Sequence, residues 1–208
     1  MTVDAFESLL AEIRACRLCA AELPLGPNPV LQANPSARLL IIGQAPGTRV
    51  HTTGIPWNDR SGDRLRLWTG LNSLDFYDES RIALVPVGFC YPGRLPKGGD
   101  RPPRPECAPL WHPRLLPALT GLRLTLLVGG YAQASLLGPR RKETLTATVQ
   151  AFRDYLPELL PLPHPSWRTT GWERRNPWFG EELLPQLRML VQAALQPSYP
   201  GKQFSNYR

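Results

Sequence analysis

The sequence predicts an α/β fold, a three-layer α/β/α sandwich around a small, mainly parallel four-stranded sheet. Short apolar runs bounded by Gly or Pro recur along the chain, at 38–42, 82–87, 122–128 and 160–163. Segments with helical periodicity separate them. Continuous apolar runs are typical of strands buried on both faces, and their alternation with helices is typical of a parallel sheet covered on both sides.

The chain has 208 residues, enough for one domain with a sizeable core and too few to presume two. We expect a single domain at 1–195 and a loose C-terminal tail at 196–208. No apolar run approaches the roughly 20 residues of a membrane span, and no basic region followed by a long apolar core opens the chain. The sequence therefore predicts a cytoplasmic protein without a membrane partner.

The first helix is expected at about 4–16. The stretch 4–7 resembles a capping box with Asp in the place of Ser or Thr, and apolar residues follow at helical spacing. After a Pro-rich connection, the run 38–42 predicts a buried strand that ends at Gly43. A second helix is expected from Ser61, which can cap it, because Leu65, Trp68 and Leu71 then share one face.

The remaining elements follow the same alternation. The runs at 82–87 and 122–128 predict two strands, each followed by a helical segment. A helix is expected at 144–155, a short last strand at 160–163, and an amphipathic helix at about 177–195. Ligands of such sheets bind at the carboxyl ends of the strands. The loop after Gly43, Cys90 and His164 all fall at that edge, where the sequence predicts the site.

Two segments at this edge hold residue types that carry chemistry. The first joins the loop Gly43-Gln44-Ala45-Pro46-Gly47 to the stretch 53–62, which supplies an aromatic ring at Trp57 and an acid at Asp59. Taken alone, a turn rich in Gly and Pro more often only connects two elements of secondary structure. The second segment, His164-Pro165-Ser166-Trp167-Arg168, places an imidazole, a hydroxyl, an indole and a cation on one tight turn.

The four cysteines are too few for a secreted disulfide scaffold. They are spaced as Cys16-x2-Cys19 and Cys90-x16-Cys107. Ordinary thiols, a zinc site and an iron-sulfur cluster are all compatible with this spacing, which does not decide among them.

Together these motifs resemble the uracil-DNA glycosylase superfamily, which carries a Gly-x-x-Pro loop after the first strand and a His-Pro-Ser loop after the last. Both occur in order within about 13–190. The first loop and the cysteines are most similar to the iron-sulfur, thermostable-type branches. Thr-Gly-x-Pro-aromatic with a nearby Asp-x-Ser-Gly looks like the branch with a Gly-Leu-Ala-Pro-Gly loop. This resemblance implies that Cys16, Cys19, Cys90 and Cys107 hold a 4Fe-4S cluster as a structural staple, with zinc as the alternative occupant.

The resemblance also implies a monofunctional glycosylase that hydrolyses the N-glycosidic bond of uracil in DNA and leaves an abasic site. Cleavage produces a cationic sugar and an anionic base, so electrostatic stabilisation should dominate. By the resemblance, His164 donates to a uracil carbonyl and Trp57 stacks on the base. The base and the attacking water are expected to contact the loop Gly43-Gln44-Ala45-Pro46-Gly47.

Two positions depart from the family pattern. Ala45 stands where some branches carry a water-orienting Asp, and we expect Asp59 to substitute, with Asp63 and His51 as reserves. The purely structural alternatives are helix capping by Asp59 and Asp63 and a core role for Trp57. The stretch 85–90 lacks the Asn that reads the edge of uracil in related enzymes, so backbone groups at Gly88 and Phe89 are expected to contact the base.

Uracil-containing DNA is the expected partner. Extruding a base costs a few kcal/mol of unstacking, and a side chain wedged into the gap is the usual device. Trp167 and Arg168 after Ser166 are the candidates, and Arg174 and Arg175 are expected to contact phosphates. A formal charge of +7 makes a polyanionic partner plausible.

A monomer suffices for excision, and no obligate protein partner is inferred. The protein is expected at the nucleoid.

Two competing functions remain open. A non-catalytic or weakly active DNA-lesion binder on the same fold is favoured by Ala45 and by the missing Asn, whereas Asp59 argues against it. A small-molecule nucleotide hydrolase is the third possibility, but the first loop lacks the Lys-Ser/Thr ending of a phosphate-binding P-loop.

Overall fold

A computed structural model describes residues 2–197 of the chain. Its centre is a sheet of four parallel strands in the order β2-β1-β3-β4, which confirms the predicted fold class. The strands are β1 (Leu39–Gly43), β2 (Ile82–Pro86), β3 (Leu124–Val128) and β4 (Leu159–Leu162). The third strand begins two residues later than the apolar run at 122. After β1 the chain forms β2 on one side of it, and β3 then pairs with its other side. Because the strand order reverses at this point, a crevice is expected at the carboxyl ends of β1 and β3.

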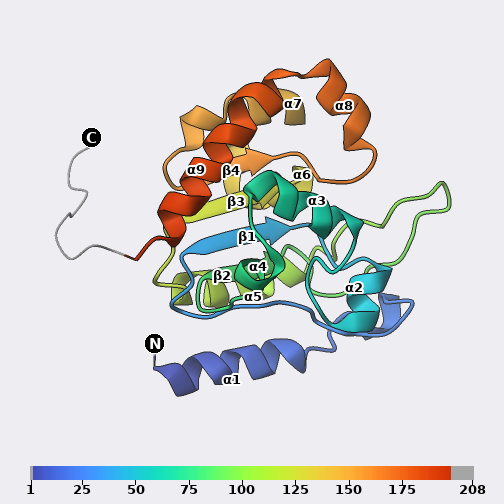
Figure 1. The fold of residues 1–208 in the computed structure, drawn as a ribbon. Coiled ribbons are helices and arrows are strands. Elements are labelled where there is room, and N and C mark those ends of the chain that lie inside the picture. Colours follow the sequence, from blue (N-terminus) through green and yellow to red (C-terminus); the bar gives the residue numbers. More distant parts are fainter. Residues whose placement is uncertain (1, 198–208) are drawn as a thin grey trace.

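Helices cover both faces of the sheet, as Figure 1 shows. Side chains of β1 alternate between two cores: Leu39 and Ile41 enter one, and Leu40 and Ile42 enter the other. The first core is closed by α3 (Arg60–Thr69), α4 (Ser73–Phe76), α7 (Leu145–Gln150) and α9 (Leu184–Leu195). The second is closed by α1 (Val3–Arg14), α5 (Cys107–Leu115) and α6 (Gly130–Leu137).

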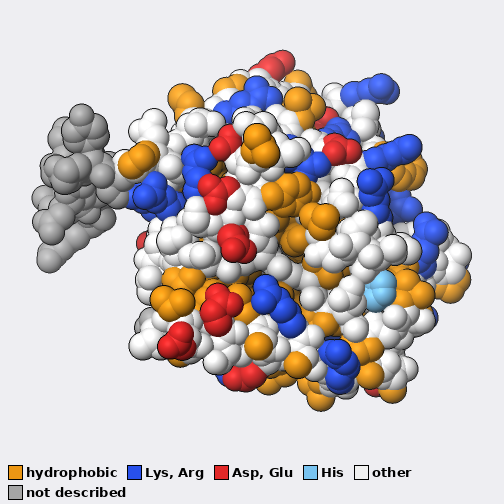
Figure 2. All heavy atoms as spheres, turned by 60° about the horizontal axis from the view of Figure 1, so that its bottom comes forward, with side chains coloured by type: hydrophobic (Ala, Val, Ile, Leu, Met, Phe, Trp, Pro, Cys, Tyr) orange, Lys and Arg blue, Asp and Glu red, His pale blue; other side chains and the backbone are white. Residues whose placement is uncertain are grey.

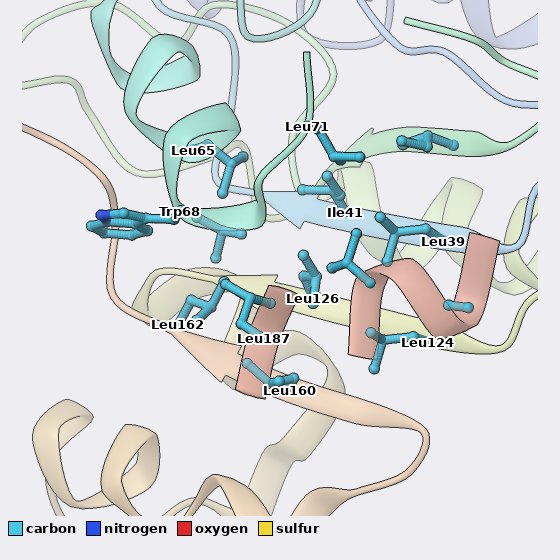
Figure 3. Close-up of a cluster of buried hydrophobic side chains, with 14 of the residues drawn as sticks. Leu39, Ile41, Leu65, Trp68, Leu71, Leu124, Leu126, Leu160, Leu162 and Leu187 are labelled. Atoms are coloured by element: carbon cyan, nitrogen blue, oxygen red, sulfur yellow. The ribbon is translucent and has the colours of Figure 1, made fainter. Parts of the chain in front are cut away.

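The first core packs apolar side chains of the helices against those of the strands. Figure 3 shows Leu65 and Trp68 of α3 and Leu187 of α9 meeting the strand residues Leu126 and Leu162. Burial of such side chains is the main favourable contribution to the folding free energy. This packing holds α3 rigidly against the sheet, and the first turn of α3 carries part of the site.

Two of the predicted helix starts are wrong. Thr2, rather than Asp4, caps α1, because its hydroxyl accepts from the amide of Ala5 at 3.3 Å. Asp59, rather than Ser61, caps α3, because its Oδ1 accepts from the amide of Gly62 at 2.8 Å. Both residues are N-cap types, and each lies one position before the first helical residue.

Two predicted helices are interrupted. The expected helix at 144–155 divides into α7 and a 3₁₀ turn, Phe152–Tyr155, while Thr144 caps it as a side-chain acceptor. The last helix begins with a π turn, Phe179–Leu183, and continues as α9. Pro185 lies at the start of α9 and has no amide N–H, so regular α-helical bonding cannot pass through it. α9 ends at Leu195, the predicted end of the domain, and 198–208 of the predicted tail lie outside the described residues.

Two short helices flank the expected site, α2 (Thr48–Thr53) and α8 (Thr169–Arg175). Among residues 2–197, no helix combines the length and the apolar character that crossing a bilayer requires.

Candidate active site

A pocket of about 110 Å³ opens at the carboxyl ends of the strands. The loop 43–47, which follows β1, forms one wall, and Trp57, Asp59 and His164 contribute side chains to it. Asp100, which the sequence analysis did not single out, also lines it. The structure therefore brings the two sequence motifs together around one cavity, although Gly47 and His164 are 117 positions apart in the sequence.

Trp57 holds an unusual conformation that places its indole over the end of β1. Its φ is 56°, in the left-handed region that residues with a Cβ seldom adopt. Two glycines make room for it: a Cβ on Gly43 would lie 2.7 Å from the indole Cζ2, and a Cβ on Gly62 would overlap the carbonyl oxygen of Trp57. The indole and the His164 ring are 5.9 Å apart between centroids and tilted by 32°. A flat aromatic face thus lies next to an imidazole in the pocket.

His164 follows β4 on a tight turn. Its carbonyl oxygen accepts from the amide of Ser166 at 2.8 Å and from the hydroxyl of Thr169. Burial lowers the pKa of His164 below its usual value, and the negative charge of Asp59 partly opposes that shift. The imidazole is therefore neutral at pH 7, so that one ring nitrogen donates a hydrogen bond and the other accepts.

Asp59 serves the helix and the pocket at once. Its Oδ1 caps α3, whereas its Oδ2 lies 3.9 Å from the position that a Cβ on Gly47 would take. The capping role and the pocket position are thus compatible, because a carboxylate has two oxygens. Asp63, one of the reserve acids, is 73% exposed and pairs with Arg66 at 2.6 Å, outside the pocket lining.

His51, Gly88 and Phe89 lie away from this pocket. The ring of His51 faces Tyr91, with 6.1 Å between centroids. Gly88 donates its amide to the Gln44 carbonyl at 2.9 Å, and Phe89 donates its amide to Sγ of Cys107 at 3.3 Å. The structure places Gly88 and Phe89 in the wall of the cysteine pocket, with both amides engaged.

Asp100 could have been found from a weak signal. It follows Gly98 and Gly99, whose φ values of 87° and 89° form the turn of a small hairpin after β2. A glycine pair beside an acid, in a loop that leaves the carboxyl end of a strand, indicates a turn that presents a carboxylate at the site edge.

The turn 164–168 is hydrogen-bonded to a side chain of α3, and some of its own side chains are exposed. Arg64 of α3 donates to the carbonyl oxygen of Ser166 at 2.8 Å and to Glu173 of α8 at 2.6 Å. Trp167 is 79% exposed, and the guanidinium of Arg168 lies 5.5 Å from the centre of its ring. The predicted wedge residues are therefore presented to solvent beside the pocket.

Arg174 and Arg175 lie in the last turn of α8 and are exposed. Figure 2 shows Lys and Arg side chains gathered on its right-hand side, where α2 and α8 lie in Figure 1, whereas acidic side chains lie mostly toward the left. Arg168, Arg174 and Arg175 are exposed near the pocket, and we call the surface that they form the basic face.

All four cysteines line a second, small cavity of about 20 Å³. None forms a disulfide. The amide of Phe89 donates to Sγ of Cys107 at 3.3 Å. Burial raises the pKa of Cys107 to about 12 and raises the pKa values of Cys19 and Cys90. Free thiols with raised pKa values are protonated at neutral pH, so a metal centre would have to displace these protons when it binds.

The four cysteines offer thiol donors to one cavity. They come from three segments of the chain, and the amide of Phe89 points at Sγ of Cys107, a kind of hydrogen bond that also accompanies the sulfur ligands of iron-sulfur clusters. In the described part of the chain, however, no three His, Cys, Asp or Glu side chains are grouped so that they could hold one metal ion.

Comparisons with known proteins agree with the motifs. The model of the uracil DNA glycosylase superfamily matches residues 31–188. The chain also resembles a solution NMR structure of a candidate uracil DNA glycosylase from Methanosarcina acetivorans, with 21% identity, a TM-score of 0.39, and coverage of 76% of this chain and 93% of that chain. The family match spans well over half of the sequence, and the chain belongs to the uracil DNA glycosylase superfamily.

Proposed function

We propose that this protein hydrolyses the N-glycosidic bond of uracil in DNA, releasing the base and leaving an abasic site. The supporting observation is the pocket that unites the indole of Trp57, the neutral imidazole of His164 and the carboxylate of Asp59. Family membership supports a role on DNA. The detailed chemistry follows from what each of these three groups can do.

Breaking the glycosidic bond separates charge, and the pocket supplies matching groups. The extruded base stacks on Trp57, and a neutral His164 donates its N–H to a base carbonyl as negative charge develops there. Asp59 places negative charge beside the sugar as it becomes cationic. Groups aimed at developing charge in a site that excludes water are commonly the largest contribution to catalysis. The backbone of Gln44 and Ala45 lines the space between base and water.

DNA binding is assigned to the basic face. Trp167 is exposed enough to enter the gap left by an extruded base. Ser166 and Arg168 lie beside it, and Arg174 and Arg175 are placed to contact phosphates, whose attraction weakens with salt. A monomer can carry out this reaction. Such an enzyme acts on DNA, so we expect it in the cytoplasm, at the nucleoid. We also retain the prediction of a single domain at 1–195.

We assign a 4Fe-4S cluster to Cys16, Cys19, Cys90 and Cys107. Its contribution would be a structural cross-link, since hydrolysis transfers no electrons between substrate and enzyme. The cysteines join the segment after α1, the segment after β2 and the first residue of α5. Cys90 follows the same strand as the hairpin that carries Asp100, so the cross-link would steady one side of the active site.

Single-turnover excision from an end-labelled oligonucleotide with one uracil tests the proposal. Asn also caps helices well, so Asp59→Asn removes the charge and keeps the cap. We expect wild type to cut and Asp59→Asn to lose about a hundredfold or more in rate, whereas Asp63→Asn, with its carboxylate outside the pocket, cuts like wild type. A wild-type protein that binds the oligonucleotide without cutting would instead support the lesion-binder alternative.

A further inference from the structure

The hairpin that carries Asp100 connects the two motif loops. Arg101 donates its amide to the Gly93 carbonyl at 2.8 Å, and Leu95 donates to Gly99 at 2.9 Å, which closes the hairpin. The Gln44 side chain reaches the carbonyl of Arg101 at 3.3 Å. On the other side, a Cβ on Gly99 would lie only 3.2 Å from a guanidinium nitrogen of Arg168. The hairpin is thus fixed between the loop after β1 and the turn after β4.

This placement turns the Asp100 carboxylate toward Asp59. The Oδ2 of Asp100 is 3.8 Å, and the Oδ2 of Asp59 3.9 Å, from the same point, the position of a Cβ on Gly47. Gly47 has no side chain, so this space belongs to the pocket. Within the described residues the Asp100 carboxyl accepts no hydrogen bond and forms no ion pair. Both of its oxygens are therefore available to a ligand in the pocket.

Two carboxylates around one space suit a water molecule. Water donates two hydrogen bonds, and each carboxylate accepts one, which leaves a lone pair free to attack. A single carboxylate cannot orient water in this way, because the second O–H remains free to rotate. Ala45 lines the same pocket with a methyl group that accepts nothing. The chain thus provides a pair of acceptors although its first loop has none.

We propose that Asp100 is a second catalytic carboxylate, which with Asp59 holds the attacking water beside Gly47 and receives its proton. This inference rests on the proposed glycosylase function. The bond between C1′ and the base nitrogen breaks, and its electron pair leaves with the base as an anion. The water oxygen bonds to C1′ and keeps one hydrogen as the new hydroxyl. Its other proton passes to Asp100 and then to solvent.

The surroundings of Asp100 and Asp59 suit the two carboxylates to different roles. Partial burial raises the pKa of Asp100, and the charge of Asp59 raises it further, whereas Arg94 and Arg168 lower it. Asp100 is exposed at the pocket rim, so it can release a proton to solvent. Asp59 is anchored by the hydrogen bond that it accepts from Gly62, so its carboxylate holds a fixed position in the pocket. Asp100 is therefore the better base and Asp59 the better electrostatic partner.

The test compares wild type with Asp100→Asn, Asp100→Glu and the control Asp63→Asn. Two quantities are measured from about pH 4 to pH 9: the single-turnover rate of uracil excision and the dissociation constant for the same oligonucleotide. We expect Asp100→Asn to slow excision about a hundredfold with an unchanged dissociation constant. Wild-type excision should fall on the acidic side as Asp100 is protonated, and Asp100→Asn should lose that part of the profile. Asp100→Glu keeps a carboxylate, so it should keep the acidic limb at a reduced rate.

The outcomes separate the two proposals. If wild type excises uracil and Asp100→Asn does so equally fast at every pH, the role of Asp100 is refuted and the glycosylase function stands. A variant whose binding weakens as much as its rate falls also refutes it, because Asp100 would then act in binding. If wild type excises no uracil, the function fails first, and the role of Asp100 fails with it. Thermal unfolding of each variant shows whether the fold is retained.

Discussion

Arg64 of α3 donates to the carbonyl oxygen of Ser166 at 2.8 Å, which joins the helix capped by Asp59 to the turn that carries His164. The same guanidinium pairs with Glu173 of α8 at 2.6 Å and lies 5.4 Å from the centre of the Trp68 ring. The side chains of Arg64 and Glu173 are only 20% and 27% exposed. One side chain therefore connects the helix capped by Asp59 to the turn that carries His164.

Loss of this connection should reduce stability and activity together. Arg64→Ala leaves the Glu173 carboxylate and the Ser166 carbonyl without their donor, so we expect the free energy of unfolding to fall by about 1–3 kcal/mol. Urea denaturation measures it. The control is Arg114→Ala, which breaks an exposed pair with Glu12 and should change stability by less than about 1 kcal/mol. Equal effects of the two substitutions would contradict a special role for Arg64.

The cap and the charge of Asp59 should separate in the free energy of unfolding. Asp59→Ala removes the acceptor for Gly62 and should cost about 1 kcal/mol, whereas Asp59→Asn retains a cap and should cost a few tenths. Thermal or urea unfolding distinguishes them. An Asn variant as unstable as the Ala variant would show that Asp59 stabilises the fold by its charge and not by its capping bond.

Gly62 should tolerate no side chain. A Cβ there would overlap the carbonyl oxygen of Trp57, which already holds a left-handed φ of 56°. Gly62→Ala should therefore lower the free energy of unfolding by about 2 kcal/mol or more. Gly180→Ala is the control, since a Cβ at Gly180 meets nothing within 4 Å. A Gly62→Ala protein that unfolds like wild type would mean that the Trp57 backbone adapts.

Stability should fall as the pH drops below the ordinary histidine range. Burial lowers the pKa values of His112 and His164 from 6.5. Below that value the unfolded chain binds protons that the folded chain does not, so the free energy of unfolding decreases with falling pH. Urea unfolding at about pH 5 and pH 7 tests this expectation. His112→Asn should flatten the dependence, because it removes a buried imidazole whose pKa is lowered by burial.

The cysteine assignment predicts a metal content. Protein purified without oxygen should contain about four irons and four inorganic sulfides per chain and absorb visible light. Cys107→Ala should lower the iron content and the unfolding temperature, independently of any activity. Stoichiometric zinc without sulfide would overturn the cluster, and metal-free protein of equal stability would leave four ordinary thiols.

The local patterns predicted the fold because each strand is a continuous apolar run and each connection contains a helix. Trp57, Asp59 and His164 could be placed at one edge because the carboxyl ends of parallel strands meet there. The sequence left the cap of this helix open between Asp59 and Ser61, because both are N-cap residue types. Only the backbone geometry around Trp57 and Gly62 decides between them.

By itself, the sequence determined the α/β class, the positions of the strands and the two motifs that flank the site. Tertiary structure alone decided that Asp100 shares a pocket with Asp59, and that Gly88 and Phe89 face the cysteines instead. The physical reason is the distance along the chain over which each signal acts. Apolar periodicity and turn residues act over a few positions, whereas the Asp100 hairpin is held by Gln44 and Arg168, contacts that exist only after β1, β2 and β4 have paired through the sheet.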